Sequence, residues 1–144
     1  MSILAGCGFH LRGGETTPAW RLQIEGPVEP ALRDMLHDLS TAGGQPARLE
    51  LRRPRWQQRV LTVGADGKAL EYELRLRLDY RLTDPRGGEL LSWQALDLRR
   101  DYAFDPGQVL AKSREAELLR QDLRREALQR IGRRLRQLAQ GERP

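Results

Sequence analysis

The chain has 144 residues and a formal net charge of +5; 39% of its residues are hydrophobic and 31% are charged. This length suits one domain with its own core, and no run approaches the roughly 20 apolar residues that a membrane-spanning helix needs. Nearly all the positive charge is arginine, because Lys68 and Lys112 are the only lysines. The arginine guanidinium binds phosphates and carboxylates well, so nucleic acid, anionic lipid and acidic protein are all possible classes of partner. The alternative is that the arginines only form a solvated surface.

The N-terminal residues hold the single cysteine, Cys7, directly after Leu4-Ala5-Gly6. An aliphatic residue, two small residues and a cysteine match the lipobox of bacterial lipoproteins. There the thiol receives a diacylglycerol, and several acyl chains give stable anchoring. We expect Cys7 to be this lipid anchor, and Gly8 after it favours delivery to the outer membrane. The alternative is an incidental cysteine near a frayed terminus.

Residues 1–6 are interpreted as the remnant of a lipoprotein signal peptide, because a complete signal has an apolar stretch of about 7–15 residues. Residues 7–144 are then expected to form a single domain. One cysteine and two histidines make a poor ligand set, so we expect no metal site. The only covalent group expected is the lipid on Cys7.

The first half of the chain is predicted to combine short strands with one helix. Residues 20–24 alternate in polarity and indicate a strand. Residues 27–39 indicate a helix, because Pro27 and Pro30 stand at its start and an apolar stripe follows at helical spacing. This stripe consists of Leu32, Met35, Leu36 and Leu39. Residues 47–51 alternate again and indicate a second strand.

The middle of the chain is predicted to contain longer strands. Residues 59–63 lead into turn-forming residues 64–67, after which residues 70–82 form a strand. Leucine and tyrosine alternate with charged residues throughout 70–82, which indicates a long half-buried strand with one charged face. After a second turn at 84–88, residues 90–104 return as a strand.

From residue 108 to residue 138 the apolar period becomes helical, and the opposite side is dense in arginine and glutamate. The apolar stripe consists of Leu119, Leu123, Leu128, Ile131, Leu135 and Leu138. The order strand, helix, three or so strands, helix predicts an α+β fold: a mostly antiparallel four-stranded sheet with two helices packed on one face. The face of alternating arginine and acid would then look toward solvent or a partner.

The sequence contains no nucleophile elbow, phosphate loop, dinucleotide fingerprint or metal-spaced cluster, so we predict that the chain is not an enzyme. A lone histidine such as His10 or His37 is more often a surface or core residue than a base. Glu71 and Glu73 share one face of a strand lined with arginine. That setting favours cross-strand ion pairs over a catalytic pair of carboxylates.

The arginine content is also compatible with nucleic-acid binding. Tyr72, Tyr80 and Trp93 are candidates for stacking platforms of the kind found on sheet-based RNA binders. The two tyrosines, however, are in phase with the leucines, as core residues are, and the acids between the arginines would repel phosphates. Nucleic-acid binding is therefore the less favoured alternative.

Several short motifs together resemble a known family. Residues 4–12 read L-A-G-C-G-F-H-L-R, and residues 63–74 contain G-x-x-x-E-Y. R-x-Y at 100–102 and L-A-K at 110–112 follow in the same order. This pattern resembles the LptE family of lipopolysaccharide-assembly lipoproteins of Gram-negative bacteria, also called rare lipoprotein B. The match covers most of the chain and is weakest over 15–58.

The resemblance implies an outer-membrane lipoprotein that is held by its lipid anchor on the periplasmic side. Members of the family sit as a plug inside the β-barrel LptD, help that barrel to assemble, and bind lipopolysaccharide on its way to the cell surface. Their fold is α+β, with two helices against a four-stranded sheet. A generic periplasmic-facing lipoprotein with another protein partner is the alternative.

The resemblance also implies which residues bind lipopolysaccharide, whose lipid A carries phosphates and whose inner sugars carry carboxylates. Lys112 is the first candidate, because it matches the family's L-A-K lysine where the last helix begins and backbone N–H groups favour anions. Lys68, at the turn, is the second, although Ala65 and Asp66 stand where family members carry a basic residue. Arg100, which matches the R-x-Y arginine, is the third. For each, the alternative is an exposed charge or a local ion pair.

Overall fold

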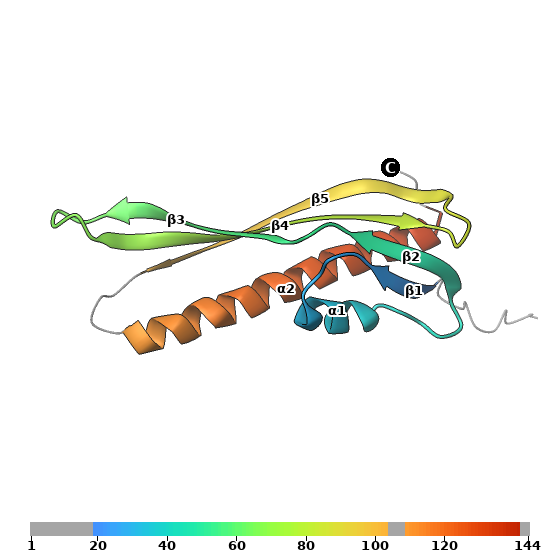
Figure 1. Ribbon diagram of the computed structural model, residues 1–144, viewed down its shortest axis with the longest axis horizontal. Helices are drawn as coiled ribbons and strands as arrows, with labels where there is room; N and C mark the ends of the chain where they lie inside the picture. The colour runs from blue at the N-terminus through green and yellow to red at the C-terminus, as the bar shows by residue number, and fades with distance from the viewer. Residues whose placement is uncertain (1–18, 104–108, 142–144) are drawn as a thin grey trace, which may run out of the picture.

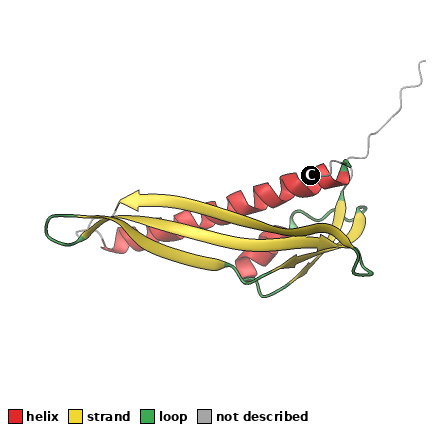
Figure 2. Ribbon diagram, turned by 90° about the horizontal axis from the view of Figure 1, so that it is seen from above, coloured by secondary structure: helices red, strands yellow, loops and turns green. Residues whose placement is uncertain are grey.

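One 15-residue strand, β4, organises the sheet, and the other elements are arranged around it (Figure 1). The structure, a computed structural model, describes residues 19–103 and 109–141, with only the backbone of residues 109–112. The elements are β1 (Trp20–Glu25), α1 (Pro30–His37), β2 (Gln45–Leu51), β3 (Arg55–Val63), β4 (Ala69–Thr83), β5 (Glu89–Ala103) and α2 (Val109–Ala139). Both helices lie on one face of the sheet, and no described element covers the other face (Figures 1 and 2).

The strands pair around β4. It pairs with antiparallel β5 on one side, and on the other side with two shorter antiparallel strands. β3 pairs with the first part of β4 and β2 with its last residues, so β2 and β3 lie end to end. They are separated at residues 52–54, where Pro54 has no N–H to donate to a ladder. β1 completes the sheet as a parallel neighbour of β2. The predicted α+β fold is confirmed; the sheet has five strands rather than four, because each of the five segments predicted to be extended forms a strand of its own.

The core lies between the helices and the helix-facing side of β4. Alternate residues of this strand are at most 3% exposed; they are Leu74, Leu76, Leu78, Tyr80 and Leu82. α2 contributes a buried stripe of Leu123, Ala127, Ile131 and Leu135. The other leucines of the predicted stripe, Leu119, Leu128 and Leu138, are partly buried. The alternation in residues 70–82 is thereby confirmed as the division between a buried face and a charged face.

α1 is shorter than the predicted helix over 27–39, because the chain must first turn out of β1. Gly26 adopts φ of +119°, and an added Cβ would lie 2.0 Å from the backbone oxygen of Leu51. The Val28 N–H donates to the Gly26 carbonyl, and the helix begins only at Pro30. α2 begins and ends within one residue of its predicted bounds.

A buried arginine joins the two helices to the sheet. The Arg124 guanidinium of α2 donates to both carboxylate oxygens of Glu29, at 2.8 and 3.2 Å, and to Glu117 at 3.3 Å. It also lies 5.5 Å from the ring centroid of Trp56 on β3. Hydrogen bonding to Glu29 raises the pKa of Arg124, so the side chain stays charged. Since Glu29 directly precedes α1, this guanidinium fixes α1, α2 and β3 relative to one another.

We predict that Arg124→Ala lowers the free energy of unfolding by about 2 kcal/mol, because it removes packing and leaves Glu29 without its partner. Arg125→Ala is the matched control, since Arg125 is 61% exposed and pairs with the exposed Asp122. The control should lose less than about 0.5 kcal/mol. Urea denaturation measures both values, and equal losses would contradict the structural role of Arg124.

Candidate functional site

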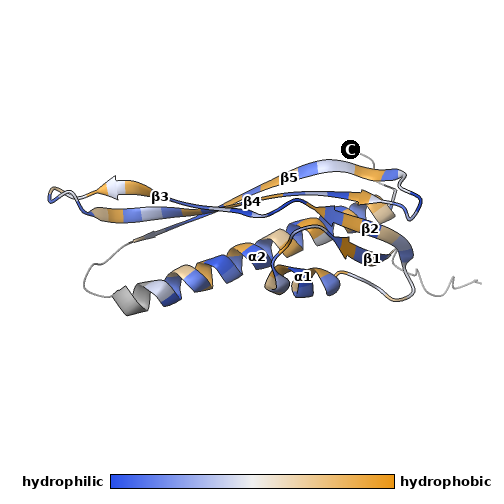
Figure 3. Cartoon of the chain, in the orientation of Figure 1, coloured by the Kyte–Doolittle hydropathy of each residue, from blue (hydrophilic) through white to orange (hydrophobic). Residues whose placement is uncertain are grey.

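The end of the β3–β4 hairpin exposes a group of residues that we call the tip: Val60, Leu61, Val63, Lys68 and Leu70. The four apolar side chains are 47%, 40%, 58% and 44% exposed in chain order. Figure 3 shows hydrophobic colouring at this end of β3. Large apolar side chains that gather on a surface beside a cation are typical of a site for an amphiphile or an apolar partner.

The tip is exposed because the core ends before the hairpin does. On β4, Leu74 is 2% exposed, while Leu70, on the same face and nearer the turn, is open to solvent. Tyr72 lies between them, is partly buried, and stacks on Tyr102 of β5 with ring centroids 5.6 Å apart. Sequence reasoning missed the tip, because the alternation continues along β4 without marking where α2 ceases to cover it.

Lys68 follows the turn at the tip. Gly67 adopts φ of +78°, and the Lys68 backbone N–H donates to Asp66 at 3.1 Å. The Lys68 ammonium lies 3.5 Å from the Asp66 carboxylate, and both side chains are more than half exposed. An ion pair this exposed contributes little to stability. Lys68 therefore forms a local ion pair, which was the alternative to ligand binding expected from the sequence. Its ammonium group nevertheless stays accessible to a ligand.

The start of α2 lies at the same end of the molecule as the β3–β4 turn (Figures 1 and 2). Lys112 belongs to the first turn of this helix. Its side chain, like Cys7 and His10, lies outside the described residues. The backbone thus brings two of the three predicted contact residues, Lys68 and Lys112, to one end of the protein.

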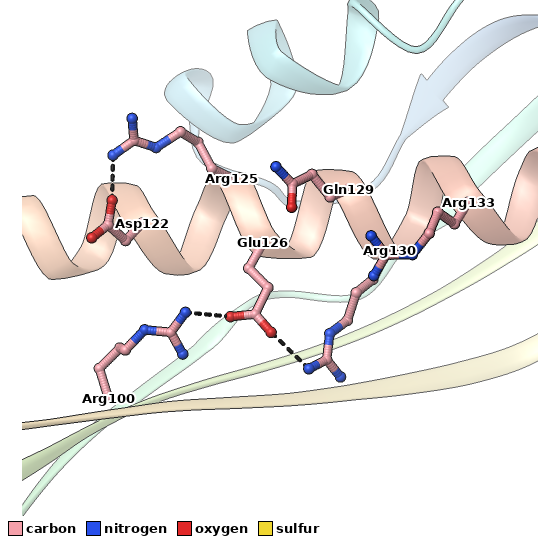
Figure 4. Close-up of a pocket in the computed structure, with 7 residues that line it drawn as sticks. All are labelled: Arg100, Asp122, Arg125, Glu126, Gln129, Arg130 and Arg133. Atoms are coloured by element: carbon pink, nitrogen blue, oxygen red, sulfur yellow. Dashed lines mark hydrogen bonds and ion pairs between the residues drawn. The ribbon is translucent and has the colours of Figure 1, made fainter.

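Arg100 lies elsewhere, in a groove between β5 and α2 (Figure 4). This arginine groove has a volume of about 730 Å³ and is lined by Arg100, Asp122, Arg125, Glu126, Gln129, Arg130 and Arg133. Arg100 of β5 and Arg130 of α2 both donate to Glu126, each at 2.6 Å. Arg100 of β5 lies opposite Leu74 of β4. Leu74 is six residues after Lys68 in the chain, so Arg100 and Lys68 are separated by about 20 Å along the strands. The structure therefore does not bring Arg100 together with Lys68.

Glu126 organises the arginine groove. Burial would raise the pKa of its carboxyl, but hydrogen bonds from Arg100 and Arg130 outweigh burial and lower the pKa. Glu126 therefore stays ionised and holds both guanidinium groups in place. Arg125 pairs with Asp122, whereas Arg133 forms no ion pair with the described residues. Sequence reasoning missed this groove, because β5 and α2 form its two sides. Arg100 and Glu126, which meet in it, are 26 positions apart in the chain.

The sheet face away from the helices is a lattice of ion pairs between neighbouring strands. Asp97 of β5 lies among three arginines, Arg75, Arg77 and Arg99. Hydrogen bonds from Arg75 lower the pKa of the Asp97 carboxyl to about 2. Glu73 pairs with Arg59 of β3 at 3.0 Å, which confirms its predicted cross-strand ion pair. Charged side chains dominate this face, and ion pairs link them across strands even where two arginines face each other, as Arg75 and Arg99 do.

The remaining candidates from the sequence have structural partners. Glu71 accepts a hydrogen bond from the Thr62 hydroxyl at 2.7 Å, so its cross-strand partner is a hydroxyl group. Tyr80 lies in the core, and the Arg52 guanidinium covers the Trp93 ring at 4.2 Å from its centroid. Within the described residues, no three His, Cys, Asp or Glu side chains gather as metal ligands. None of the described helices combines the length and apolar character that crossing a membrane requires.

Solved structures share this fold. The solution structure of a lipoprotein B from Nitrosomonas europaea aligns with a TM-score of 0.73 at 28% identity, covering 94% of each chain. The crystal structure of the rare lipoprotein B from Shewanella oneidensis gives 0.60 at 27% identity, covering 75% of this chain and 89% of that one. The one-sided layer of two helices on a long sheet therefore defines this chain as a domain of the rare lipoprotein B type.

Sequence comparison identifies the family. Residues 13–135 match LptE, described as lipopolysaccharide-assembly. The chain is 31% identical to the LPS-assembly lipoprotein LptE of Photorhabdus laumondii and 32% identical to that of Pectobacterium atrosepticum. Both alignments cover 92% of this chain, and they cover 79% and 78% of those proteins. The chain belongs to the LptE family of lipopolysaccharide-assembly lipoproteins, which assigns it a role in lipopolysaccharide assembly and confirms the resemblance.

The ion-pair lattice predicts a specific dependence of stability on pH. The pKa of Asp97 falls from 3.8 to about 2 on folding, so this carboxylate stabilises the fold above pH 4 and the contribution is lost between pH 4 and 2. Asp97→Asn should therefore be less stable at pH 7, and the difference from the unsubstituted protein should shrink toward pH 2. Chemical denaturation across this range measures the difference.

Asp101→Asn is the control, because Asp101 is exposed on the same strand and forms no ion pair with the described residues. Its stability should run parallel to that of the unsubstituted protein. A constant offset for Asp97→Asn down to pH 2 would show that the arginines around Asp97 do not stabilise its ionised form.

Proposed function

We propose that this chain is an outer-membrane lipoprotein, anchored on the periplasmic side by a lipid on Cys7, that binds lipopolysaccharide and partners the barrel LptD. In this role it plugs the barrel, assists its assembly and performs no catalysis. The observation that carries the proposal is the tip, where four exposed apolar side chains lie on the hairpin whose turn carries Lys68. Lipopolysaccharide has the matching chemistry, because its lipid A joins acyl chains to phosphates.

The arrangement at this end supports contact with both parts of lipid A. The apolar residues of the tip offer a surface for acyl chains, and burying them there would release water from both partners. Lys68 and Lys112 then meet the phosphates through charge-assisted hydrogen bonds. The start of α2 adds the positive end of the helix dipole, which favours anions.

The uncovered face of the sheet supports the role as a barrel plug. A protein that sits inside a β-barrel must present polar surfaces, because the lumen of such a barrel is polar. The lattice of arginine and acid on β4 and β5 meets this requirement and presents no apolar patch there. Its ion pairs also hold long side chains in fixed positions, which reduces the entropy lost when a partner packs on them.

Lys112→Glu is expected to weaken binding of lipopolysaccharide about tenfold, because it replaces one charge-assisted contact with repulsion. Leu70→Ser should weaken binding as well without unfolding the protein, since Leu70 is 44% exposed. Arg86→Glu is the control: it makes the same charge change as Lys112→Glu on the exposed β4–β5 turn, at the other end of the sheet. Equilibrium binding of the full-length protein measures all three, and a loss in the control as large as in Lys112→Glu would count against a site at the tip.

The barrel partnership predicts a stable complex. Co-expression of the full-length gene with the large outer-membrane barrel of the same genome, with an affinity tag on the C-terminus of the lipoprotein, should yield both proteins in equal amounts. A lipoprotein that is exported normally and purifies without the barrel would contradict the partnership and favour a periplasmic lipoprotein with another partner.

A further inference from the structure

The proposed binding of lipid A at the tip assigns no role to the arginine groove. This groove lies about 20 Å from the turn that carries Lys68, measured along the strands. Its lining holds four arginines against two acids, which leaves an excess of two positive charges in one hollow. On an ordinary solvated surface, charged side chains point separately into solvent. Here Arg100 of β5 and Arg130 of α2 both donate to the Glu126 carboxylate (Figure 4).

We propose that the arginine groove is a second anion site, which binds a phosphate or carboxylate on the inner sugars of the lipopolysaccharide whose lipid A occupies the tip. This inference rests on the proposed function, because it names a second contact for the same ligand. Guanidinium groups bind phosphates and carboxylates through two parallel N–H donors, and such planar recognition favours arginine over lysine.

Glu126 prepares the groove for such a ligand. It accepts one hydrogen bond from Arg100 and one from Arg130, at 2.6 Å each, and is the less exposed partner of both ion pairs. Each guanidinium carries five N–H donors, and Arg100 also donates to the Arg99 carbonyl at 2.8 Å, so most donors of both side chains still stay available. The ligand would meet arginines that are already positioned, which lowers the entropy cost of binding.

Arg133 supplies the charge that the groove itself does not neutralise. It is exposed, lines the groove, and forms no ion pair with the described residues. The sequence around it explains why: residues 127–141 contain four arginines and no acid, whereas residues 109–126 contain four acids. The second half of α2 therefore has a net positive charge, and only Arg130 of the groove's arginines in this half pairs with an acid in the described residues.

The position and shape of the groove favour a saccharide of lipopolysaccharide over a small anion. An anion bound at the tip and another about 20 Å away require a ligand of that length, which inner sugars joined to lipid A provide. The groove is also shallow and open to solvent, so a saccharide can lie across its arginines. The two sites would then hold one extended molecule at two points.

The test compares two ligands and two kinds of variant in the full-length protein. One ligand is lipopolysaccharide with its inner sugars, and the other is lipid A alone. Arg133→Glu should weaken binding of the first about tenfold and leave binding of lipid A within about twofold. Lys112→Glu, at the start of α2, should weaken binding of both ligands. Arg133→Gln should show a smaller loss than Arg133→Glu, because it removes the donors without adding repulsion.

Arg86→Glu is the matched control for charge and should leave both affinities unchanged. If Arg133→Glu behaves like Arg86→Glu with both ligands, or weakens lipid A as much as lipopolysaccharide, the arginine groove does not bind the inner sugars and the inference is overturned. Failure of the unsubstituted protein to bind either ligand would instead overturn the proposed function, and the second site with it. Circular dichroism of each variant establishes that the fold is retained.

Discussion

The two-residue period of β4 is the constraint on which the rest of the structure depends. Leucines and Tyr80 point to one face, where α1 and α2 cover them, and charged residues point to the other. A strand of 15 residues and a helix of 31 have similar lengths, about 50 and 46 Å, so α2 can follow β4 over most of its course. The strand pairs on both edges, and every other strand except β1 is placed by its register with β4. A shift of one residue would turn the charged face into the core.

This constraint also creates the functional surfaces. The helices cover the middle and one end of the sheet, so the alternation that builds the core leaves Leu70 exposed at the other end. The same hairpin carries Lys68 at its turn, and apolar and cationic groups therefore meet without any special loop. On the opposite face, cross-strand pairs such as Glu73 with Arg59 keep a dense set of charges nearly balanced. The protein thus has an amphiphilic end and a polar face, which serve different partners in the proposed role.

The sequence predicts those features that follow from a local period. The helix over 108–138, the strand over 70–82 and the core position of Tyr80 all depend on spacing within one segment, and the structure confirms each of them. Features that depend on two segments were missed or only partly predicted. The arginine groove needs the register of β5 and the rotation of α2 together, and the end-to-end position of β2 and β3 needs the register of both strands with β4. The late start of α1 reflects the positive φ of Gly26, which no periodicity indicates.

Arg100 shows how the fold changes the interpretation of a motif. The family's R-x-Y pattern groups it with Lys68 and Lys112, but the pleat directs it toward α2, where Glu126 holds it beside Arg130. A single basic and apolar tip would not distinguish lipopolysaccharide from phospholipids, because a phosphate and acyl chains are common to all of these. The proposed second anion site, about 20 Å away, would add affinity only for a lipid long enough to reach both sites, which lipids with small headgroups cannot do. In the proposed role, the separation of Arg100 from the tip would add selectivity for a lipid that carries charged sugars to a general affinity for anionic lipids.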